Sequence, residues 1–396
     1  MRVTIERADS KAAVKEFIAL PPRLYRGLAG YTAPMTMERR GLLDPAKAPF
    51  FKHGEAQYWI ARKDGAAVGR ISAQIDHAQI RASGPGDALE GAGMFGCLDA
   101  IDELEVVRAL IETAEDWIAD RGFGRVFGPC LLSMNEEAGL LVEGREEPAL
   151  IMVPWHPAYL EGHVEACGYA KMRDLHYWRL DSAQAELEAR RVRLALQRRR
   201  PDLVVRALDL KNLARDVEIM RAVYNDAWQD NWGFVPLQKE DLEGISKDLK
   251  PFVPADAGVI VEMAGRPVGV ALVLPNLFEA TGDLGADPSP LGWLKLGYRM
   301  FTHRFRTGRI ILLGVVFDLR HSVGGAAIAM TMIDEMIARS ARYETDWLEA
   351  GWVLENNQAL LKILEQFNFK RVRTLRLYDK VLEADAAAGE GDDNDG

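Results

Sequence analysis

The sequence predicts two α+β domains in tandem, each built around a mixed, mostly antiparallel sheet that is flanked by helices. Three observations lead to this fold class. The chain has 396 residues, which is more than a single hydrophobic core usually supports. Its composition, with 48% hydrophobic and 27% charged residues, is that of an ordinary globular protein. The order of strand-like and helix-like segments in the first half recurs in the second half with longer insertions.

The elements of the first half follow from hydrophobic periodicity and from turn residues. Apolar side chains recur at helical spacing between Leu104 and Arg121, which predicts an amphipathic helix there. Asp64 and Gly65 separate two strand-like runs, a pattern typical of a hairpin. The predicted strands are 3–7, 56–62, 66–76, 94–100, 125–128 and 171–180; the predicted helices are 104–121, 157–167 and a stretch over 11–40 that breaks at Pro21, Pro22 and Pro34.

The second half repeats this order around a continuous apolar run. Residues 310–316 are all apolar or glycine, which is typical of a central strand that is buried on both faces. Ala264 and Gly265 mark a second hairpin. The predicted strands are 203–207, 257–263, 266–274, 310–316, 346–352 and 371–382, and the predicted helices are 213–228, 326–342 and 358–366.

A domain boundary is predicted at the arginine-rich segment before Pro201. Residues 185–200 contain six arginines among good helix formers, which indicates a solvated linker helix. The last fourteen residues contain six carboxylates and no Lys or Arg, and such a segment cannot bury enough apolar surface to fold. The sequence therefore predicts a first domain over 1–182, a linker helix over 183–201, a second domain over 202–382 and a disordered acidic tail over 383–396.

Charge and cysteine content narrow the classes of function. The formal net charge is −10, of which the tail supplies six, so the body lacks the basic excess of a nucleic-acid-binding protein. The three cysteines are widely spaced, which predicts neither a disulfide framework nor a thiolate metal site. No apolar run approaches the ~20 residues that cross a bilayer, and the first residues lack a secretion signal. We therefore expect a cytoplasmic protein without a metal.

The segment that follows the apolar run has the properties of an anion-binding site. Gly324, Gly325 and Ala326 are small, so backbone N–H groups at the start of the next helix can approach a ligand. The helix dipole favours negative charge at the same end, and Arg320 adds a fixed positive charge. Together these features predict a seat for a pyrophosphate.

This segment resembles the acyl-CoA loop of the GNAT acyltransferase superfamily, in which Arg/Gln-x-x-Gly-x-Gly/Ala follows the fourth strand. The frame here is Arg320-His-Ser-Val323-Gly324-Gly325, with valine where the family usually has glycine. The resemblance implies an acyl-CoA cosubstrate and backbone N–H groups near Val315 and Val316 that stabilise the oxyanion of the reacting thioester. The implied cofactor-binding residues are Val315, Val316, Phe317, Arg320, His321, Val323, Gly324, Gly325, Ala326 and Asn356.

A second match lies in residues 354–369, which resemble the GNAT segment of Asn, a helix and Gly-Phe. Asn356 occupies the Asn position, whereas Leu364 stands where many members have a tyrosine that protonates the departing thiolate. In the first half, residues 157–169 resemble the same segment, but residues 97–103 offer no phosphate loop. The resemblance implies that the first domain has a GNAT fold without a cofactor site of its own.

The tandem arrangement and an aromatic, polar cluster narrow the resemblance to a bacterial family. Residues 224–236 and 135–144 are similar to segments of the double-GNAT proteins that include bacterial ceramide synthases. Those enzymes transfer a fatty acyl group from acyl-CoA to the amine of a long-chain sphingoid base. The resemblance implies that the acceptor is bound by Tyr224, Trp228, Asn231, Trp232 and Phe234, although the two tryptophans are equally compatible with core packing.

The acceptor amine must lose a proton before it attacks the thioester, so an ionisable group or a water is expected near the reaction. The candidate bases are Glu349 and Glu355, on or just after the last central strand, and His321. For any one of these residues, a solvated or helix-capping role is the more common one.

An insertion before the apolar run has the pattern of a membrane-surface helix. Residues 291–309 contain Lys and Arg but no acid. Such a helix can lie in an anionic headgroup layer and pass an amphiphile inward, or it can pack on the domain as a cap. Its apolar stripe is Leu294, Tyr298, Phe301 and Phe305, and its basic stripe is Lys295, Arg299, His303 and Arg306.

The expected function is an acyl-CoA-dependent N-acyltransferase of bacterial ceramide synthesis, acting in the cytoplasm or at the inner face of the cell membrane. An N-acetyltransferase for a small amine or amino acid is the alternative within the superfamily. A noncatalytic double-GNAT protein that binds acyl-CoA is an alternative of another class, and Val323 and Leu364 are the features that favour it.

Overall fold

A computed structural model describes residues 2–83, 89–182, 203–239 and 254–382. The predicted linker helix and the predicted acidic tail lie outside these residues. The first half contains the strands β1 (Val3–Arg7), β2 (Gly54–Lys63), β3 (Ala66–Asp76), β4 (Ala92–Ala100), β5 (Arg125–Gly128), β6 (Leu140–Glu143) and β7 (Ala170–Asp181), and the helices α1 (Lys11–Leu24), α2 (Thr36–Leu43), η1 (Pro49–Lys52), α3 (His77–Ala82), α4 (Leu104–Ala119) and α5 (Tyr159–Ala166).

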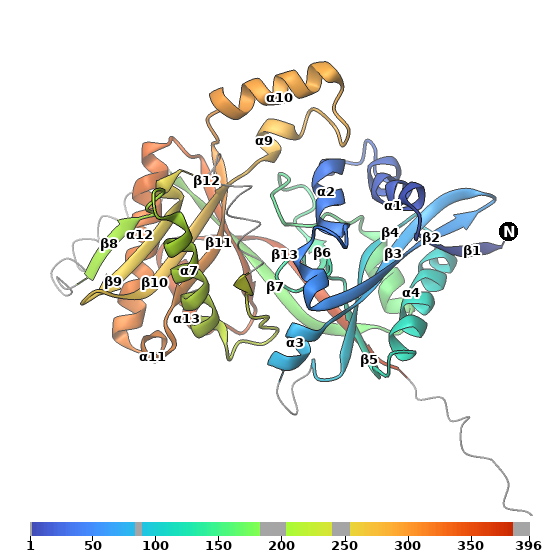
Figure 1. Cartoon of the computed structure of the whole chain (residues 1–396), viewed down its shortest axis with the longest axis horizontal. Helices are drawn as coiled ribbons and strands as arrows, with labels where there is room; N and C mark the ends of the chain where they lie inside the picture. The colour runs from blue at the N-terminus through green and yellow to red at the C-terminus, as the bar shows by residue number, and fades with distance from the viewer. Residues whose placement is uncertain (1, 84–88, 183–202, 240–253, 383–396) are drawn as a thin grey trace, which may run out of the picture.

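Apart from β6, which has no counterpart among the described strands of the second half, the second half repeats the order of strands found in the first (Figure 1). Its strands are β8 (Leu203–Ala207), β9 (Gly258–Met263), β10 (Arg266–Pro275), β11 (Thr307–Val315), β12 (Trp347–Leu354) and β13 (Lys370–Val381). Its helices are α7 (Leu213–Trp228), η2 (Ala255–Ala257), α9 (Phe278–Thr281), α10 (Pro290–Thr302), α11 (Phe317–Arg320), α12 (Val323–Arg342) and α13 (Gln358–Gln366).

The two halves exchange their last strands. β13 lies between β5 and β7, and β7 lies between β13 and β12, so that the 13 strands of the described residues form one sheet. Tyr378 of β13 is opposite Gly128 of β5, whereas Leu180 of β7 is opposite Leu348 of β12. The predicted mixed, mostly antiparallel architecture flanked by helices is confirmed, and the exchange joins the two predicted sheets edge to edge.

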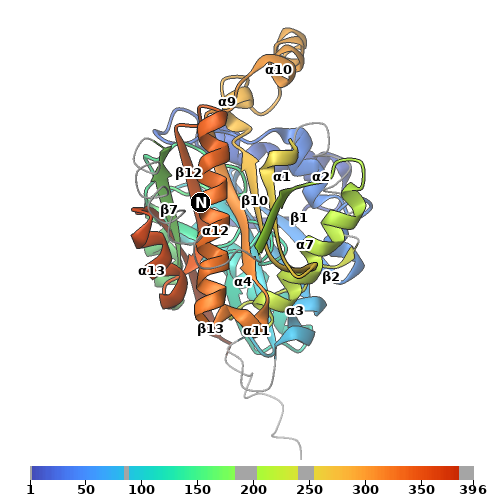
Figure 2. The ribbon, with the colours of Figure 1, turned by 90° about the vertical axis from the view of Figure 1, so that its left-hand side faces the viewer.

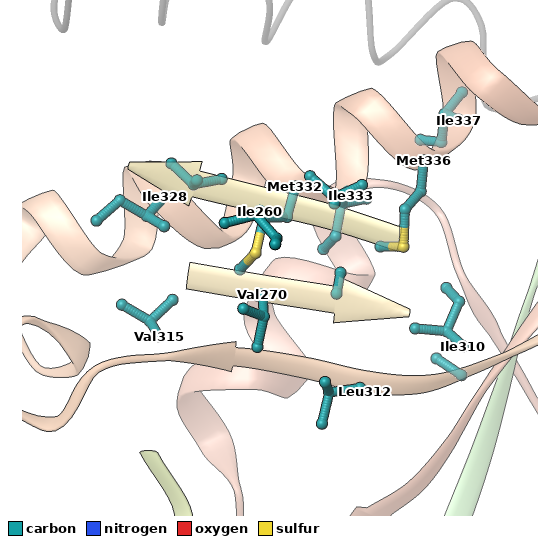
Figure 3. Close-up of a cluster of buried hydrophobic side chains, with 14 of the residues drawn as sticks. Ile260, Val270, Ile310, Leu312, Val315, Ile328, Met332, Ile333, Met336 and Ile337 are labelled. Atoms are coloured by element: carbon teal, nitrogen blue, oxygen red, sulfur yellow. The ribbon is translucent and has the colours of Figure 1, made fainter. Parts of the chain in front are cut away.

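Separate hydrophobic clusters cover the two faces of the first-half sheet. Trp59 and Ala61 of β2 pack with α4, whereas Tyr58 and Ile60 of the same strand pack with α1. This alternation follows because successive side chains of a strand point to opposite faces. The second half has its own core, in which α12 packs on β9, β10 and β11 (Figure 3); it includes Ile260, Val270, Ile310, Leu312, Ile328, Met332, Ile333 and Met336.

Helix α1 continues through Pro21 and Pro22, so the break predicted there is wrong. A proline inside a helix leaves the carbonyl four residues earlier without its backbone donor. Here the Phe17 carbonyl, which Pro21 leaves free, accepts a hydrogen bond of 2.9 Å from the guanidinium of Arg70. Tyr25 N–H donates to the Pro21 carbonyl at 2.9 Å, which continues the helix beyond the prolines.

Helix α10 projects away from the sheet, at the top of the molecule in Figures 1 and 2. It ends at Thr302 rather than at residue 309, because β11 begins at Thr307. Lys295 and Arg299 form ion pairs with Asp283, so the predicted basic stripe is largely neutralised. The two other members of that stripe are also paired, His303 with Glu279 and Arg306 with Asp346. No helix within the described ranges is long and apolar enough to span a bilayer.

Candidate active site

The parallel strands β11 and β12 diverge, and a cavity opens between them. They pair only from Thr307 to Ile310, opposite Trp347 to Ala350, although β11 continues to Val315. A cavity of about 290 Å³ lies at this divergence, and residues 310–313 and 350–354 belong to its wall. Beyond Ile310, β11 has no partner strand on this side among the described residues, so its backbone can pair with a ligand.

The five residues predicted to bind the acceptor all line this cavity: Tyr224, Trp228, Asn231, Trp232 and Phe234. Trp228 stacks on Tyr224 with ring centroids 4.8 Å apart. The Tyr224 hydroxyl donates to Asn135 Oδ1 at 3.0 Å, and burial raises the pKa of Tyr224, so this hydroxyl remains protonated. Trp228 also lies against Gly314 of β11, where a Cβ would collide with the indole ring. The structure thus brings these residues together; their role in binding the acceptor stays a prediction.

A segment of the first half completes the wall of the cavity. Met134, Asn135, Glu136 and Met152 line it, and Asn135 Nδ2 donates to the Val235 carbonyl at 3.1 Å. Glu136 is the one carboxylate in the described part of the lining. The sequence associates this segment with the tandem family but gives no sign that it reaches into the second half, so its contribution to the site was not predicted.

The predicted pyrophosphate seat lies where α12 begins. The Ser322 hydroxyl caps this helix by accepting the Gly325 N–H at 3.0 Å. Glycine is required at 325 because a Cβ there would collide with the Leu319 carbonyl. Arg320 donates to the Ala227 carbonyl at 2.6 Å, which holds its guanidinium beside the helix start. The predicted residues His321, Val323, Gly324 and Ala326 surround the same point, and Val323 is 87% exposed.

Three other predicted cofactor residues have backbone groups that are already engaged. The Val316 N–H donates to the Val268 carbonyl at 3.1 Å, so this N–H is not free to stabilise an oxyanion as predicted. The Phe317 N–H donates to Asp226 Oδ2 at 2.6 Å. The Asn356 carbonyl accepts from the Gln358 N–H at 2.9 Å.

The predicted bases lie apart from one another, and none is among the residues that line the cavity. Glu349 is fully buried and accepts from Arg373 Nε at 2.5 Å and from Arg179 at 3.0 Å. Glu355 accepts from Lys171 Nζ at 2.9 Å. The pKa of Glu355 lies below its ordinary value, because burial, which acts to raise it, is outweighed by this hydrogen bond and others that stabilise the carboxylate. The third candidate, His321, accepts from Arg320 Nε at 3.0 Å at the helix start. Their catalytic roles stay predictions.

No cluster of three or more His, Cys, Asp or Glu side chains that could hold a metal ion occurs in the part of the chain that the structure describes.

Comparison with known proteins gives two relatives that match nearly the whole chain. Protein YghO of Escherichia coli (strain K12) is 34% identical over 94% of each chain. A bacterial ceramide synthase of Caulobacter vibrioides (strain NA1000 / CB15N) is 36% identical over 94% of this chain and 95% of its own length. No family model matches the chain.

Solved structures support the tandem fold. A tandem GNAT protein from the clavulanic acid biosynthesis pathway aligns with a TM-score of 0.54 at 11% identity, over 96% of this chain and 98% of that one. A GCN5-related N-acetyltransferase from Sphaerobacter thermophilus aligns with a TM-score of 0.51 at 11% identity, over 96% and 95%. Identity this low shows the fold alone. The relatives and the fold together show that the chain belongs to the family of tandem GNAT-fold N-acyltransferases that includes the bacterial ceramide synthase.

Proposed function

We propose that the protein transfers a fatty acyl group from acyl-CoA to the amine of a long-chain sphingoid base and so makes ceramide. The observation that carries this proposal is the apolar cavity at the divergence of β11 and β12, with Leu313, Leu360 and Trp228 in its wall. Such a wall stabilises a hydrocarbon chain through apolar burial, and an acetyl group would leave most of it unused. The name of the Caulobacter relative, bacterial ceramide synthase, supports the same substrate class.

Acyl-CoA suits the helix start and the open edge of β11. Its pyrophosphate would bind at the N-terminus of α12, next to Arg320. Its pantetheine arm would pair with β11 beyond Ile310. The thioester would then reach the point where β11 and β12 diverge, which is also where the cavity begins.

Glu136 takes the role of proton acceptor in this proposal. It is the carboxylate of the described lining, and its neighbour Asn135 is held by Tyr224 and by the Val235 carbonyl. A carboxylate in this position can orient the ammonium group and take its proton, which leaves a neutral amine to attack the thioester carbonyl. Leu364 also lines the cavity and has no proton to give to the departing thiolate, so that proton would come from Glu136 or from solvent.

The position of α10 favours the membrane interpretation of this helix over the cap interpretation. Leu296 is its one buried residue, whereas Phe301 is 91% exposed and Leu294 and Tyr298 are exposed on the same stripe. Aromatic and aliphatic side chains of this kind favour the membrane interface. We therefore expect Phe301→Asp to reduce flotation with liposomes. Because the basic stripe is paired, the fraction of anionic lipid should have little influence on flotation. Unchanged flotation of Phe301→Asp would contradict this contact.

The proposed function is tested by incubating the purified protein with acyl-CoA of several chain lengths and a sphingoid base. Thiol release and the amide product are followed, and a preference for long acyl chains is expected. Leu313→Trp, which fills the cavity, should abolish turnover of long chains. Turnover of acetyl-CoA with small amines would favour the small-molecule acetyltransferase, and binding of acyl-CoA without thiol release would favour the noncatalytic protein; either result overturns the proposal.

A further inference from the structure

Two buried N–H groups in the wall of the cavity have no hydrogen-bond partner among the described residues. They are Nε of Arg309 and Nε1 of Trp232. Both are donors and neither can accept a hydrogen bond. A buried donor without a partner is costly, so these two positions call for a ligand that supplies acceptor oxygens.

The remaining N–H groups of Arg309 bind neutral acceptors. Nη1 donates to the carbonyls of Ile151 and Met152 at 2.8 and 2.7 Å. Nη2 donates to the Gly351 carbonyl at 3.1 Å and to the Tyr177 hydroxyl at 3.3 Å. These bonds fix the guanidinium at the point where β11 and β12 diverge, but none of them supplies negative charge.

Other buried arginines of the described chain have a carboxylate partner, and Arg309 does not. Arg70 pairs with Asp99 at 2.7 Å, Arg339 with Glu335 at 2.8 Å and Arg373 with Glu349 at 2.5 Å. Arg309 is 4% exposed and forms no ion pair with any described residue. A buried charge normally requires a counter-charge.

The carboxylate beside Arg309 in the sheet is already shared. Glu349 is the register partner of Arg309 across β11 and β12, but its oxygens accept from Arg373 and Arg179. Arg179 also pairs with Glu147 at 2.6 Å. This group therefore contains three guanidinium groups and two carboxylates, which leaves one positive charge in excess. Arg309 is the member of the group that lines the cavity.

We propose that Arg309, together with Trp232, forms a seat for an anionic oxygen, and that the cavity binds long-chain carboxylates. The carboxylate would supply the missing counter-charge and the missing acceptors, and its chain would lie along the apolar wall. The inference rests on the proposed function only in sharing its cavity. In acyl transfer, the same seat would face the acyl carbonyl oxygen as negative charge develops on it.

The test compares binding of dodecanoate and dodecanol to the full chain by isothermal titration calorimetry. The two ligands have the same chain and differ in charge. We expect dodecanoate to bind at least about tenfold more tightly, as for a charge-assisted hydrogen bond. Arg309→Gln and Trp232→Phe should reduce this preference and leave dodecanol binding nearly unchanged. Arg304→Gln, an exposed arginine, and Trp178→Phe, a tryptophan with an unpaired N–H that lies outside the cavity wall, are the matched controls.

Arg309→Gln also loses hydrogen bonds that hold the chain together, so Arg309→Lys serves as a second variant that keeps the charge. It should retain part of the carboxylate preference. Equal affinity for dodecanoate and dodecanol, or an undiminished preference in both Trp232→Phe and the neutral Arg309 variant, overturns the proposal. Acyl transfer without a carboxylate preference refutes this seat and leaves the proposed function intact. A carboxylate preference without acyl transfer supports the seat and refutes the proposed function.

Discussion

The parallel strand pairs of both halves diverge, but the cavity at the divergence of the second half is larger and more apolar than the one beside the first. In the first half, β4 and β5 pair from Ala92 to Met94. Beyond these pairs, the segment that follows β5 stays in contact with β4. The Cys130 N–H donates to the Phe95 carbonyl at 2.9 Å, and a Cβ at Gly96 would collide with the Cys130 carbonyl. In the second half, pairing stops at Ile310 and the apolar cavity follows.

The helices that follow these strand pairs in the two halves, α4 and α12, also differ in the charge at their N-termini. Asp102, Glu103 and Glu105 surround the start of α4, and no side chain caps it. The first turn of α12 carries no acid, is capped by Ser322 and lies beside Arg320. A helix start that carries carboxylates repels a pyrophosphate. Both differences support the proposal that the first half has no cofactor site of its own.

The comparison teaches that the first half forms part of the wall of the second half's cavity. It contributes β7 to the edge of β12 and places Glu136 in the wall of the cavity. In return, the second half contributes β13 to the edge of β5. Without the other half, either half would present an unpaired strand edge. The two halves are therefore joined by the exchanged strands, and they also differ in what they contribute to the cavity.

The sharpest way to break the comparison is to remove the carboxylate that crosses from one half to the other. Glu136→Gln is expected to lower kcat by about 100-fold or more, as is typical for loss of a general base. The same assay on Glu355→Gln and His321→Ala tests the bases predicted from the sequence, and we expect these to keep most of the activity. A Glu136→Gln enzyme with normal kcat would show that water or another group takes the proton.

The second prediction concerns the ion pairs where the exchanged strands meet. Glu349 of β12 binds Arg179 of β7 and Arg373 of β13. Glu349→Gln leaves buried guanidinium groups short of a counter-charge, which should lower the free energy of unfolding by about 3–5 kcal/mol. Urea unfolding measures this change. The half-exposed pair of Lys171 and Glu355 is the control, since its loss should cost less than about 1 kcal/mol.

The local features of both halves could be predicted from the sequence, whereas the features that join the halves could not. The apolar run at 310–316 predicts β11, and the aromatic cluster at 224–234 lines one cavity because its members lie within one helix and the turn after it. The exchange of β7 and β13 was not predictable, because an alternating pattern specifies which face of a strand is buried and not which strand lies beside it.

The same limit explains why the sequence does not show where the candidate bases lie relative to the cavity. Glu349 was chosen because it lies on the strand that borders the reaction, but a carboxylate on a strand can face either side of the sheet. The Glu349 side chain faces the arginines of the exchanged strands. The sequence does not indicate that Glu136 reaches the cavity, because this residue lies in the other half, on a loop that no periodic pattern connects to the second half.

The third prediction uses a second cavity, lined mainly by the first half, whose wall includes the charged residues Arg39, Arg70 and Glu137. His156 lies in its wall and accepts the Leu141 N–H at 3.1 Å, and burial lowers the pKa of His156 to about 4. The unfolded chain binds this proton near the ordinary pKa of about 6.5. The stability that neutral His156 contributes is therefore complete above that pH and is lost as the pH falls toward 4, by at most about 3 kcal/mol.

Urea unfolding at neutral pH and at about pH 4.5 measures this loss. His156→Gln should show a smaller decrease between the two pH values than the natural chain, because glutamine can accept the same N–H and does not titrate. Equal decreases in the two proteins would show that other groups account for the acid sensitivity.

The smallest expected effect tests the two helix starts directly. Arg320→Gln removes the positive charge beside α12 and should raise KM for acyl-CoA about tenfold with kcat nearly unchanged, because a charge-assisted contact to the pyrophosphate is lost. Glu105→Lys is the matched change in the first half: it replaces a carboxylate at the start of α4 with a positive charge. If acyl-CoA binds only at α12, this variant should leave KM unchanged. A fall in KM for Glu105→Lys would place cosubstrate binding at the first helix start and reverse the assignment of the two halves, whereas no rise for Arg320→Gln would contradict a contact between Arg320 and the pyrophosphate.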